Sequence, residues 1–367
     1  MKRVRSDGRG APELDPITCE VEVIPGLEAI ATAELQSRFR RQVTVLPGLK
    51  EGLLPILFGG DLATLLDLET VLAVYGQRHF EIPRPKALLG HAAFTTLLSM
   101  IDVVRKLYPS GTFQTFRISA AGQDSTVLVR LREMIEQQTD LSFVAEEGDL
   151  LLRLRRPLDG SAGWDVLIRL SPRPLSVRPW RVCNLAGAIN ASVAQAMARL
   201  TRPHPDDFVL NLCCGSATLL IERLQFGPAR ITLACDIDPA VLTCAQENVL
   251  ESGQTTIQLQ AWDAGALPMP DACVDTILAD LPFGQLVGSH ESNVALYPRI
   301  LREAARVTIG GGLFAAITQD IRLWERLVAD AAANWRLETV LPIKLPFGGG
   351  HLRPRIYLLQ RSYRDPN

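Results

Sequence analysis

From residue 185 onward the sequence alternates between segments of strand character and segments of helical character, and this alternation restricts the possible folds more than any other feature. Strands that alternate with helices indicate a parallel sheet covered by helices on both faces. Ligands of such sheets bind beyond the carboxyl ends of the strands, so functional residues are expected there. We predict strands at 208–212, 231–235, 256–260, 274–279, 312–318, 336–343 and 355–359, and helices at 185–200, 216–224, 239–251, 295–307 and 321–332.

The first half of the chain has a different order of elements. A strand at 17–24, a helix at 27–39, a strand at 53–58, a helix at 61–68 and a strand at 71–75 approximate a ferredoxin-like unit in which one strand cannot be placed. A second group of elements follows, with helices at 87–107 and 126–138 and strands at 112–118, 149–154 and 164–170. Closely spaced prolines then indicate a stiff linker, at Pro172, Pro174 and Pro179.

Composition argues against several classes of protein. No apolar run approaches the roughly 18 residues that a membrane-spanning helix needs, so no membrane association is expected. Residues 1–15 contain acids and no apolar core, which predicts a disordered tail and not a signal peptide. The histidines are scattered, so no metal site is expected. The seven cysteines form no CxxC pair and most lie in apolar runs, which predicts buried free thiols and a cytoplasmic location.

Charge is unevenly distributed along the chain, although the net charge is only −2. Residues 201–300 hold twelve acids and four bases, whereas residues 153–181 hold seven arginines and two acids. A basic strip beside an acidic pocket could contact a phosphate backbone while the pocket holds a cationic cofactor. A solvated protein face explains the same pattern equally well.

Small or acidic residues follow each of the first four predicted strands of the second half. The single Gly215 after the first strand lets the backbone approach a ligand, but it does not make the GxGxxG pattern of a dinucleotide site. Acids after the later strands can accept hydrogen bonds from ribose hydroxyls or from an exocyclic amine. Each residue alone could be a cap or a turn, but their order at consecutive strand ends favours one ligand site: Asp236 and Ile237, Asp263 and Ala264, and Asp280-Leu281-Pro282-Phe283-Gly284.

These motifs resemble those of the class I S-adenosylmethionine-dependent methyltransferases, and more narrowly those of the THUMP-domain RNA methyltransferases. The family's loop D-x-x-C-G-S-G-T stands here as 211–218, and its catalytic D-L-P-F-G motif stands as 280–284. Segments 23–28, 169–181 and 185–197 also resemble the family's N-terminal start, the close of its THUMP domain and its lead-in helix. Asn211 replaces the usual acid and Ala217 the usual second glycine, which puts the cofactor affinity in doubt but not the fold.

The resemblance implies an α/β fold, in which an α+β ferredoxin-like and THUMP region precedes a Rossmann-like methyltransferase domain with a seven-stranded, mostly parallel sheet. The expected limits are a disordered tail at 1–15, a ferredoxin-like domain at 16–84, a THUMP-like RNA-binding domain at 85–172, a linker at 173–184 and the methyltransferase domain at 185–367. The implied cofactor is S-adenosyl-L-methionine, bound by Asn211, Cys213, Gly215, Ser216, Thr218, Asp236, Ile237, Asp263 and Ala264. RNA is expected to contact Arg153, Arg155, Arg156, Arg173, Arg178 and Arg181.

The D-L-P-F-G motif suits methylation of an exocyclic amine, whose lone pair is delocalised and must be reoriented. Asp280 and the Leu281 carbonyl can accept the two N–H bonds of such an amine. Pro282 stiffens the loop, and Phe283 offers a flat surface, on which stacking is worth roughly 1–3 kcal/mol per base.

This variant of the motif implies methylation of guanine N2 in tRNA. We also expect the protein to be a monomer. Position 6 of the acceptor stem is favoured over position 10. Two alternatives stay open. One is a methyltransferase of another amine, either adenine N6 in rRNA or DNA or a protein glutamine. The other is a non-catalytic RNA-binding relative.

Overall fold

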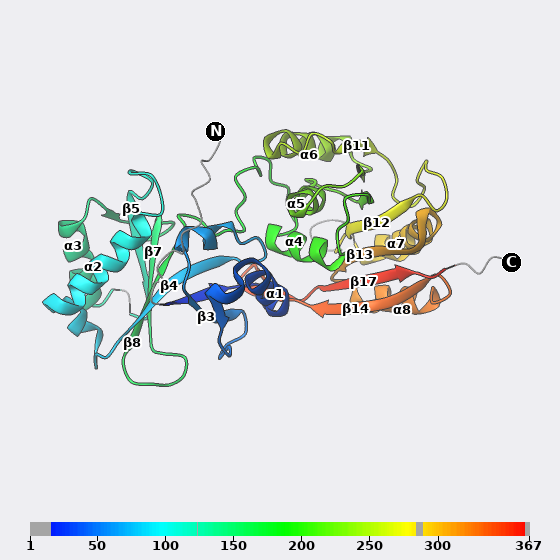
Figure 1. Ribbon diagram of the computed structural model, residues 1–367. Helices are drawn as coiled ribbons and strands as arrows, with labels where there is room; N and C mark the ends of the chain where they lie inside the picture. Colours follow the sequence, from blue (N-terminus) through cyan, green and yellow to red (C-terminus); the bar gives the residue numbers. More distant parts are fainter. Residues whose placement is uncertain (1–15, 123, 284–288, 364–367) are drawn as a thin grey trace. The chain divides into compact units, whose positions relative to one another are not determined.

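The computed structural model describes residues 16–122, 124–283 and 289–363 (Figure 1). The chain divides into two compact units, and each is described by itself. The first unit holds the chain up to Glu22 together with 32–68 and 73–173, and the second holds 23–31, 69–72 and the chain from Pro174. The predicted tail at 1–15 lies outside the described residues.

The second unit contains a seven-stranded sheet in the order β11-β10-β9-β12-β13-β17-β14. Strands β9 to β13 are parallel, whereas β17 is antiparallel to both of its neighbours. The order reverses between β9 and β12, which makes this the topological switch point of the sheet. The predicted fold of this half is confirmed by strands β9 (Phe208–Leu212), β10 (Ile231–Asp236), β11 (Gln258–Ala261), β12 (Val274–Asp280), β13 (Thr308–Thr318), β14 (Trp335–Pro342) and β17 (Arg355–Arg361).

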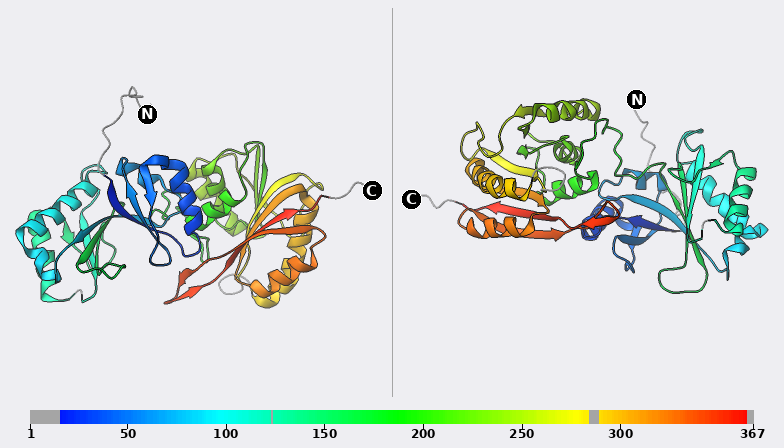
Figure 2. Two further views of the ribbon diagram at one scale, coloured as in Figure 1. Left: turned by 60° about the horizontal axis from the view of Figure 1, so that its bottom comes forward. Right: turned by 180° about the vertical axis from the view of Figure 1, so that it is seen from behind.

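Helices cover both faces of this sheet, and an apolar cluster fills the space on each side (Figures 1 and 2). One cluster lies beneath α4 (Ala191–Leu200), α5 (Thr218–Phe226) and α6 (Pro239–Ser252). The other lies beneath α7 (His290–Val307) and α8 (Ile321–Asp330). A parallel sheet of this kind is buried on both faces, so its strands are nearly continuous apolar runs.

Local capping explains where several of these helices begin. The Asn190 side chain accepts from the Ser192 N–H, so α4 begins at Ala191 and not at the predicted residue 185. Helix α7 begins five residues earlier than predicted, because Ser289 and Ser292 form a reciprocal capping box. Both differences arise from polar side chains at the helix ends, which apolar periodicity does not detect.

An eight-stranded sheet runs through the first unit in the order β2-β3-β1-β4-β8-β7-β5-β6. Strand β4 pairs antiparallel with β8, so the regions predicted as two domains share one sheet. The predicted boundary at 84/85 falls inside this unit, and the division into two domains there stays a prediction. The strands are β1 (Ile17–Glu22), β2 (Val43–Val45), β3 (Leu53–Phe58), β4 (Ala73–Phe80), β5 (Thr115–Ala120), β6 (Ser142–Phe143), β7 (Leu150–Arg155) and β8 (Trp164–Arg169).

The strand that could not be placed from the sequence is the short β2. Helices α1 (Glu28–Phe39) and α3 (Thr126–Gln138) match the predicted segments closely. The helix expected at 61–68 is a 3-10 helix at Leu62–Asp67, capped by Asp61. The long helix expected at 87–107 is interrupted at Gly90, which separates a 3-10 turn at Pro85–Leu89 from α2 (His91–Arg105).

One disulfide corrects the expectation that every cysteine is a free thiol. Cys183 and Cys244 are bonded, while Cys19, Cys213, Cys214, Cys235 and Cys273 are free. The bonded pair is 61 residues apart, so no local spacing reveals it. The Asn248 side chain aligns the two segments, because it accepts from the Cys183 N–H and donates to the Cys183 carbonyl, both at 2.9 Å.

Within residues 16–122, 124–283 and 289–363, no helix is both long enough and apolar enough to cross a membrane. In the same part of the chain, no three His, Cys, Asp or Glu side chains are arranged to hold a metal ion.

Candidate functional site

The structure brings the predicted cofactor and catalytic residues together at one edge of the seven-stranded sheet. They follow β9, β10, β11 and β12, which are adjacent in the sheet and run in parallel. Cys213 lies among them. Burial raises the pKa of its thiol, and the negative charges of Asp236, Asp280 and Asp263 raise it further. The carboxylates of all three aspartates therefore lie near enough to the Cys213 thiol, beside the switch point of the sheet, to influence its pKa.

The loop after β9 adopts an unusual backbone conformation that leaves room for a ligand. Gly215 has a φ of +52°, and a Cβ added there would meet nothing within 4 Å. Ala217 has a φ of +61° although it carries a Cβ, so it takes the left-handed conformation that glycine adopts without cost. The substitution of the family's second glycine therefore keeps the shape of the loop, at a cost of roughly 1 kcal/mol.

Ser216 and Thr218 stabilise this loop through contacts of their buried hydroxyl groups. Both side chains are buried, and their hydroxyl oxygens lie 2.9 Å apart. The Arg181 guanidinium donates to the Thr218 hydroxyl at 2.7 Å. Their hydroxyls are thus engaged within the protein, and direct contact of either one with a cofactor stays a prediction.

Asn211 is fully buried at the end of β9, and its amide nitrogen donates to two backbone carbonyls. The acceptors are the carbonyls of Leu212 and Leu278, each at 3.1 Å. A carboxylate cannot donate, so asparagine suits this environment better than the acid usual in the family. Among the described residues, the Asn211 Oδ1 has no hydrogen-bond partner, which leaves a buried acceptor beside the loop.

Asp236 is the last residue of β10 and contacts the same loop, and Ile237 directly follows the strand. The Gly215 N–H donates to one oxygen of Asp236 at 3.0 Å, and the Asp238 N–H donates to the other at 3.2 Å. This fixes the carboxylate while each oxygen keeps a lone pair for a further donor. The neighbouring Ile237 is 71% exposed, which offers an apolar surface next to an acid.

Asp263 follows β11 and is held on both oxygens. The Gly265 N–H donates to Oδ1 at 2.8 Å, and Arg299 of α7 donates to Oδ2 at 2.5 Å. Burial opposes ionisation, but these two donors hold the pKa of Asp263 below its usual value. Asp263 is therefore a fixed carboxylate, and the adjacent Ala264 is buried.

S-adenosyl-L-methionine fits these residues. The cofactor carries a cationic sulfonium, an ammonium group, a ribose diol and a flat adenine. The site supplies carboxylates at Asp236 and Asp263, an apolar surface at Ile237, a buried acceptor at Asn211 and open space over Gly215. These acceptors and this apolar surface suit the cationic groups, the ribose hydroxyls and the adenine of the cofactor.

Asp280 ends β12 at the same edge, and burial raises the pKa of its carboxyl to about 7. The Leu281 N–H donates to the Ile317 carbonyl at 3.1 Å, and the Leu281 side chain is buried. The backbone is thus fixed directly after the acid. Gly284, the last residue of the predicted motif, lies outside the described residues.

Two side chains of α7 hold the Pro282 carbonyl, and we call this arrangement the Pro282 clamp. The Asn293 amide donates to it at 2.9 Å and the Tyr297 hydroxyl at 2.6 Å. Tyr297 also lies 2.8 Å from the Thr318 hydroxyl, which must then donate to Tyr297. Asn293 and Tyr297 are fully buried, and the ring of Trp324 packs edge-on against Tyr297.

The clamp turns the Pro282 carbonyl towards α7, so it sets the direction of the peptide groups on either side. Among the described residues, no group donates a hydrogen bond to the preceding Leu281 carbonyl, which can therefore accept from a substrate. Phe283 is half-buried and packs against the apolar cluster beneath α4, α5 and α6, so only part of its ring can face a substrate.

Asn293, Tyr297 and Arg299 contribute to the site but were not predicted from the sequence. The sequence does contain a signal for Asn293 and Tyr297. Residues four apart share a helix face, and both of these lie on the apolar face of α7. A buried amide and a buried hydroxyl on such a face require partners. No sequence signal connects Arg299 with Asp263, which is 36 residues earlier.

The six arginines proposed for RNA contact fall in two different units. In the second unit, Arg178 binds the buried Glu222 at 2.8 and 3.1 Å, and Arg181 donates to Thr218 and to the Ile189 carbonyl. These two guanidinium groups fasten the linker to α5. Their contact with RNA stays a prediction, and the structure gives both an internal role.

In the first unit, the other four arginines also have partners within the protein. Arg153 binds Glu22 at 2.9 Å and lies over the Tyr75 ring. Arg155 binds the buried Glu20, Arg156 lies over the Trp164 ring, and the exposed Arg173 donates to the Glu147 carbonyl. Arg156 and Arg173 are exposed, Arg153 and Arg155 are half-buried, and RNA contact by all four stays a prediction.

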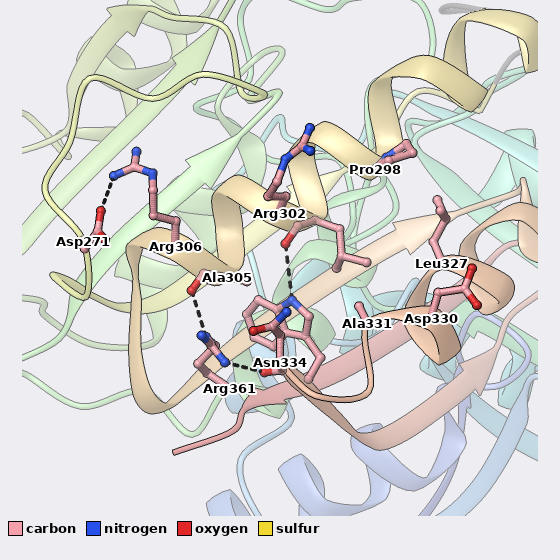
Figure 3. A pocket seen from close by; sticks show the side chains of 12 residues that line it. Asp271, Pro298, Arg302, Ala305, Arg306, Leu327, Asp330, Ala331, Asn334 and Arg361 are labelled. Carbon is pink, nitrogen blue, oxygen red and sulfur yellow. Dashed lines mark hydrogen bonds and ion pairs between the residues drawn. The ribbon is translucent and has the colours of Figure 1, made fainter. Parts of the chain in front are cut away.

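An open groove of about 570 Å³ lies at the opposite edge of the seven-stranded sheet (Figure 3). Two of its three arginines have partners within the protein. Arg306 binds Asp271 at 2.8 Å, and Arg361 donates to the carbonyls of Ala305 and Asn334. The groove is near the amino-terminal ends of β12 and β14, so it does not belong to the candidate site.

Comparison with known proteins agrees with this geometry. Residues 178–345 match the UPF0020 family, described as "RMKL-like, methyltransferase domain". The matched segment is less than half of the chain, and it is similar to a methyltransferase domain. The match includes every proposed cofactor and catalytic residue, together with the Pro282 clamp.

Among curated relatives, the chain is 30% identical over 187 residues to a Mus musculus protein named tRNA (guanine(6)-N(2))-methyltransferase THUMP3. It is 32% identical over 195 residues to a Thermus thermophilus protein named tRNA (guanine(6)-N2)-methyltransferase. These alignments cover 47% and 53% of this chain, but only 36% and 56% of the two relatives.

Solved structures extend the similarity to the whole fold. TrmN from Thermus thermophilus is 24% identical, with a TM-score of 0.72 over 94% of this chain and 99% of that chain. SMU.472, complexed with SAH, is 13% identical, with a TM-score of 0.66 over 96% of this chain and all of that chain. At these identities the comparison shows a shared fold for both halves of the protein.

A first prediction concerns Asn211. Asn211→Asp removes two donated hydrogen bonds and buries a carboxylate between two carbonyls, so we expect unfolding to become easier by roughly 2–3 kcal/mol at pH 8. The pKa of the new acid would be raised in the folded state, so the loss should shrink as the pH falls towards 5 and the acid is protonated. Urea denaturation at the two pH values measures this.

The matched control is Asn184→Asp, which makes the same change at an exposed residue and should leave stability within about 0.5 kcal/mol. Equal stability of Asn211→Asp and the unchanged protein at pH 8 would contradict the assignment of the Asn211 amide as a double donor.

Proposed function

We propose that the protein transfers a methyl group from S-adenosyl-L-methionine to the exocyclic N2 amine of a guanosine in tRNA. The observation that carries this proposal is the clamped strand end at 280–282, which presents a carboxylate and a backbone carbonyl beside a site suited to the cofactor. Such a pair of acceptors fits the two N–H bonds of an aromatic amine. The names of the relatives support tRNA and guanine as the substrate.

The cofactor, when bound, supplies an electrophilic methyl group on a sulfonium. The protein's own residues orient the amine. Asp280 in its ionised form accepts one N–H, and the Leu281 carbonyl accepts the other, which turns the nitrogen lone pair towards the methyl group. The Asp280 charge also stabilises the positive charge that develops on nitrogen, and Phe283 contributes a flat surface for the base.

The base must leave its stack to reach this strand end, because an amine inside a duplex is out of reach of a buried acid. Position 6 of the acceptor stem is the favoured target, and the names of the mouse and Thermus relatives support it over position 10. Relatives named U6 snRNA (guanine-N(2))-methyltransferase align over 134 residues, so another structured RNA is the second candidate substrate.

Two alternative functions were considered from the sequence. Methylation of adenine N6 or of a protein glutamine uses similar acceptors and is the alternative chemistry. A non-catalytic role is disfavoured by the intact arrangement of Asp236, Asp263 and Asp280. The cytoplasmic location and the monomeric state stay predictions.

The direct test incubates the purified protein with labelled cofactor and total tRNA, followed by mass spectrometry of the nucleosides. We expect N2-methylguanosine, and we expect Asp280→Ala to lower turnover by at least 100-fold with little change in cofactor affinity, because an oriented acceptor is lost. Calorimetry of cofactor binding is the control. Label in methyladenosine, or only in protein, would refute the guanine assignment.

The second prediction is a pH dependence set by Asp280. The carboxyl must be ionised to accept from the amine, and burial raises its pKa to about 7. Protonation therefore removes activity as the pH falls through 7, and kcat/KM should rise about tenfold from pH 6 to pH 8 and then level off. Asp280→Asn should flatten this profile. A rate that is independent of pH between 6 and 8 would exclude the ionised form as the acceptor.

The third prediction concerns the Pro282 clamp as a positioning device. Tyr297→Phe removes one of the two donors to the Pro282 carbonyl, so we expect kcat to fall roughly tenfold while the cofactor dissociation constant stays within twofold. Tyr357→Phe is the matched control, because Tyr357 is also buried and its hydroxyl instead donates to Glu325 at 3.0 Å. Equal kcat values for the two variants would show that the clamp does not position the site.

A further inference from the structure

A cationic hairpin follows β14 in the second unit. Strands β15 (Leu345–Phe347) and β16 (Gly350–Leu352) form it, and they pair only with each other in the described structure. Residues 343–355, which we call the hairpin arm, contain two arginines, one lysine and one histidine but no acid. This charge contrasts with residues 201–300, which hold twelve acids and four bases.

The arm lies at the same edge of the sheet as Asp280. Strand β14 runs in the direction of β13 and β12, because β17 is antiparallel to both β13 and β14. Its carboxyl end therefore meets theirs, and the arm continues from that end (Figure 2). The Arg353 N–H donates to the Gln319 side chain at 3.1 Å, which ties the arm to the residue directly after β13.

The base of the arm is held firmly. The Ile343 N–H donates to the Pro354 carbonyl, and the Lys344 N–H donates to the Pro25 carbonyl, both at 3.0 Å. Gly26, next to Pro25, has a φ of +101°, and a Cβ added there would lie 2.1 Å from the Pro342 oxygen. The chain is therefore tightly packed at the base of the arm, and this packing holds the base in place.

One face of the arm carries an aromatic ring towards solvent. Leu345 and Phe347 lie two residues apart on one strand, so their side chains share a face of the hairpin. Leu345 packs against the apolar cluster on which Phe283 also packs. Phe347 lies beyond it at the tip and is 41% exposed, and the arm's His351 and Arg353 are exposed as well.

The tip itself is open. Gly348 and Gly349 have φ values of +51° and +79°, and a Cβ added at either residue would meet nothing within 4 Å. Backbone amides in such a glycine turn can be approached closely by a phosphate group.

We propose that the hairpin arm is a second RNA-contacting surface, which binds nucleotides next to the one whose amine reaches Asp280. Phe347 stacks on a base, and Arg353 and His351 contact the adjoining phosphates. Exposed aromatic and cationic groups side by side are what an unstacked nucleic-acid strand requires. This inference rests on the proposed function for the class of substrate, but the location of the contact comes from the arm alone.

The experiment uses the full-length protein with variants Phe347→Ala and Arg353→Ala. Dissociation constants for tRNA are measured by fluorescence anisotropy at several salt concentrations, together with KM and kcat for methyl transfer. We expect Phe347→Ala to weaken tRNA binding and to raise KM at least fivefold. Arg353→Ala should also lower the slope of log affinity against log salt by about one. Cofactor binding measured by calorimetry should stay within twofold for both variants.

Two matched controls lie away from the arm in the same unit. Phe226→Ala removes a ring that is also 41% exposed, at the end of α5 far along the helix from the cofactor loop. Arg326→Ala removes an exposed arginine of α8. Both should leave tRNA binding within twofold of the unchanged protein.

The outcomes separate this inference from the proposed function. Binding of tRNA that is the same for Phe347→Ala, Arg353→Ala and their controls overturns the inference, even if the protein methylates guanosine. Conversely, a protein that methylates no RNA would refute the proposed function. In that case, weaker tRNA binding by the arm variants alone would still support the arm as an RNA contact.

Discussion

The two hydrogen bonds that Asn293 and Tyr297 donate to the Pro282 carbonyl join the end of β12 to helix α7. The rest of the candidate site depends on this connection. It fixes the peptide after Leu281, so the acid before it and the carbonyl beside it keep one geometry. Trp324 packs against Tyr297, and Thr318 donates to its hydroxyl, so the adjacent strand and helix support the same point. A preorganised pair of acceptors costs no rearrangement when a substrate amine arrives.

The two carboxylates predicted to bind the cofactor are held in another way, by hydrogen bonds from backbone N–H groups and one arginine. Gly215 and Asp238 donate to Asp236, while Gly265 and Arg299 donate to Asp263. These donors orient both carboxylates, and those on Asp263 lower its pKa, whereas burial raises the pKa of Asp280. Carboxylates at neighbouring strand ends thus have different environments, which suits the binding of a cation at two of them and the acceptance of an amine proton at the third.

Much of this could be predicted from the sequence, because apolar periodicity and strand-end residues are local. The seven-stranded sheet and the candidate acids at its edge were found in this way. The start of α7, the partner of Arg299 and the Cys183–Cys244 disulfide were not. The first depends on a capping box just before the apolar pattern begins. The other two join residues 36 and 61 positions apart, and only folding brings such residues together.

The tetrapeptide Leu-Pro-Phe-Gly occurs twice, at 281–284 and at 345–348. By itself the sequence determined a stiff apolar segment with an aromatic ring at both places, because proline restricts the backbone in the same way each time. Tertiary structure decided the difference. At Pro282 two donors from α7 capture the carbonyl and Phe283 packs on the core, whereas Phe347 pairs across a hairpin with Gly350 and is exposed. Identical residues differ because their partners come from elsewhere in the chain.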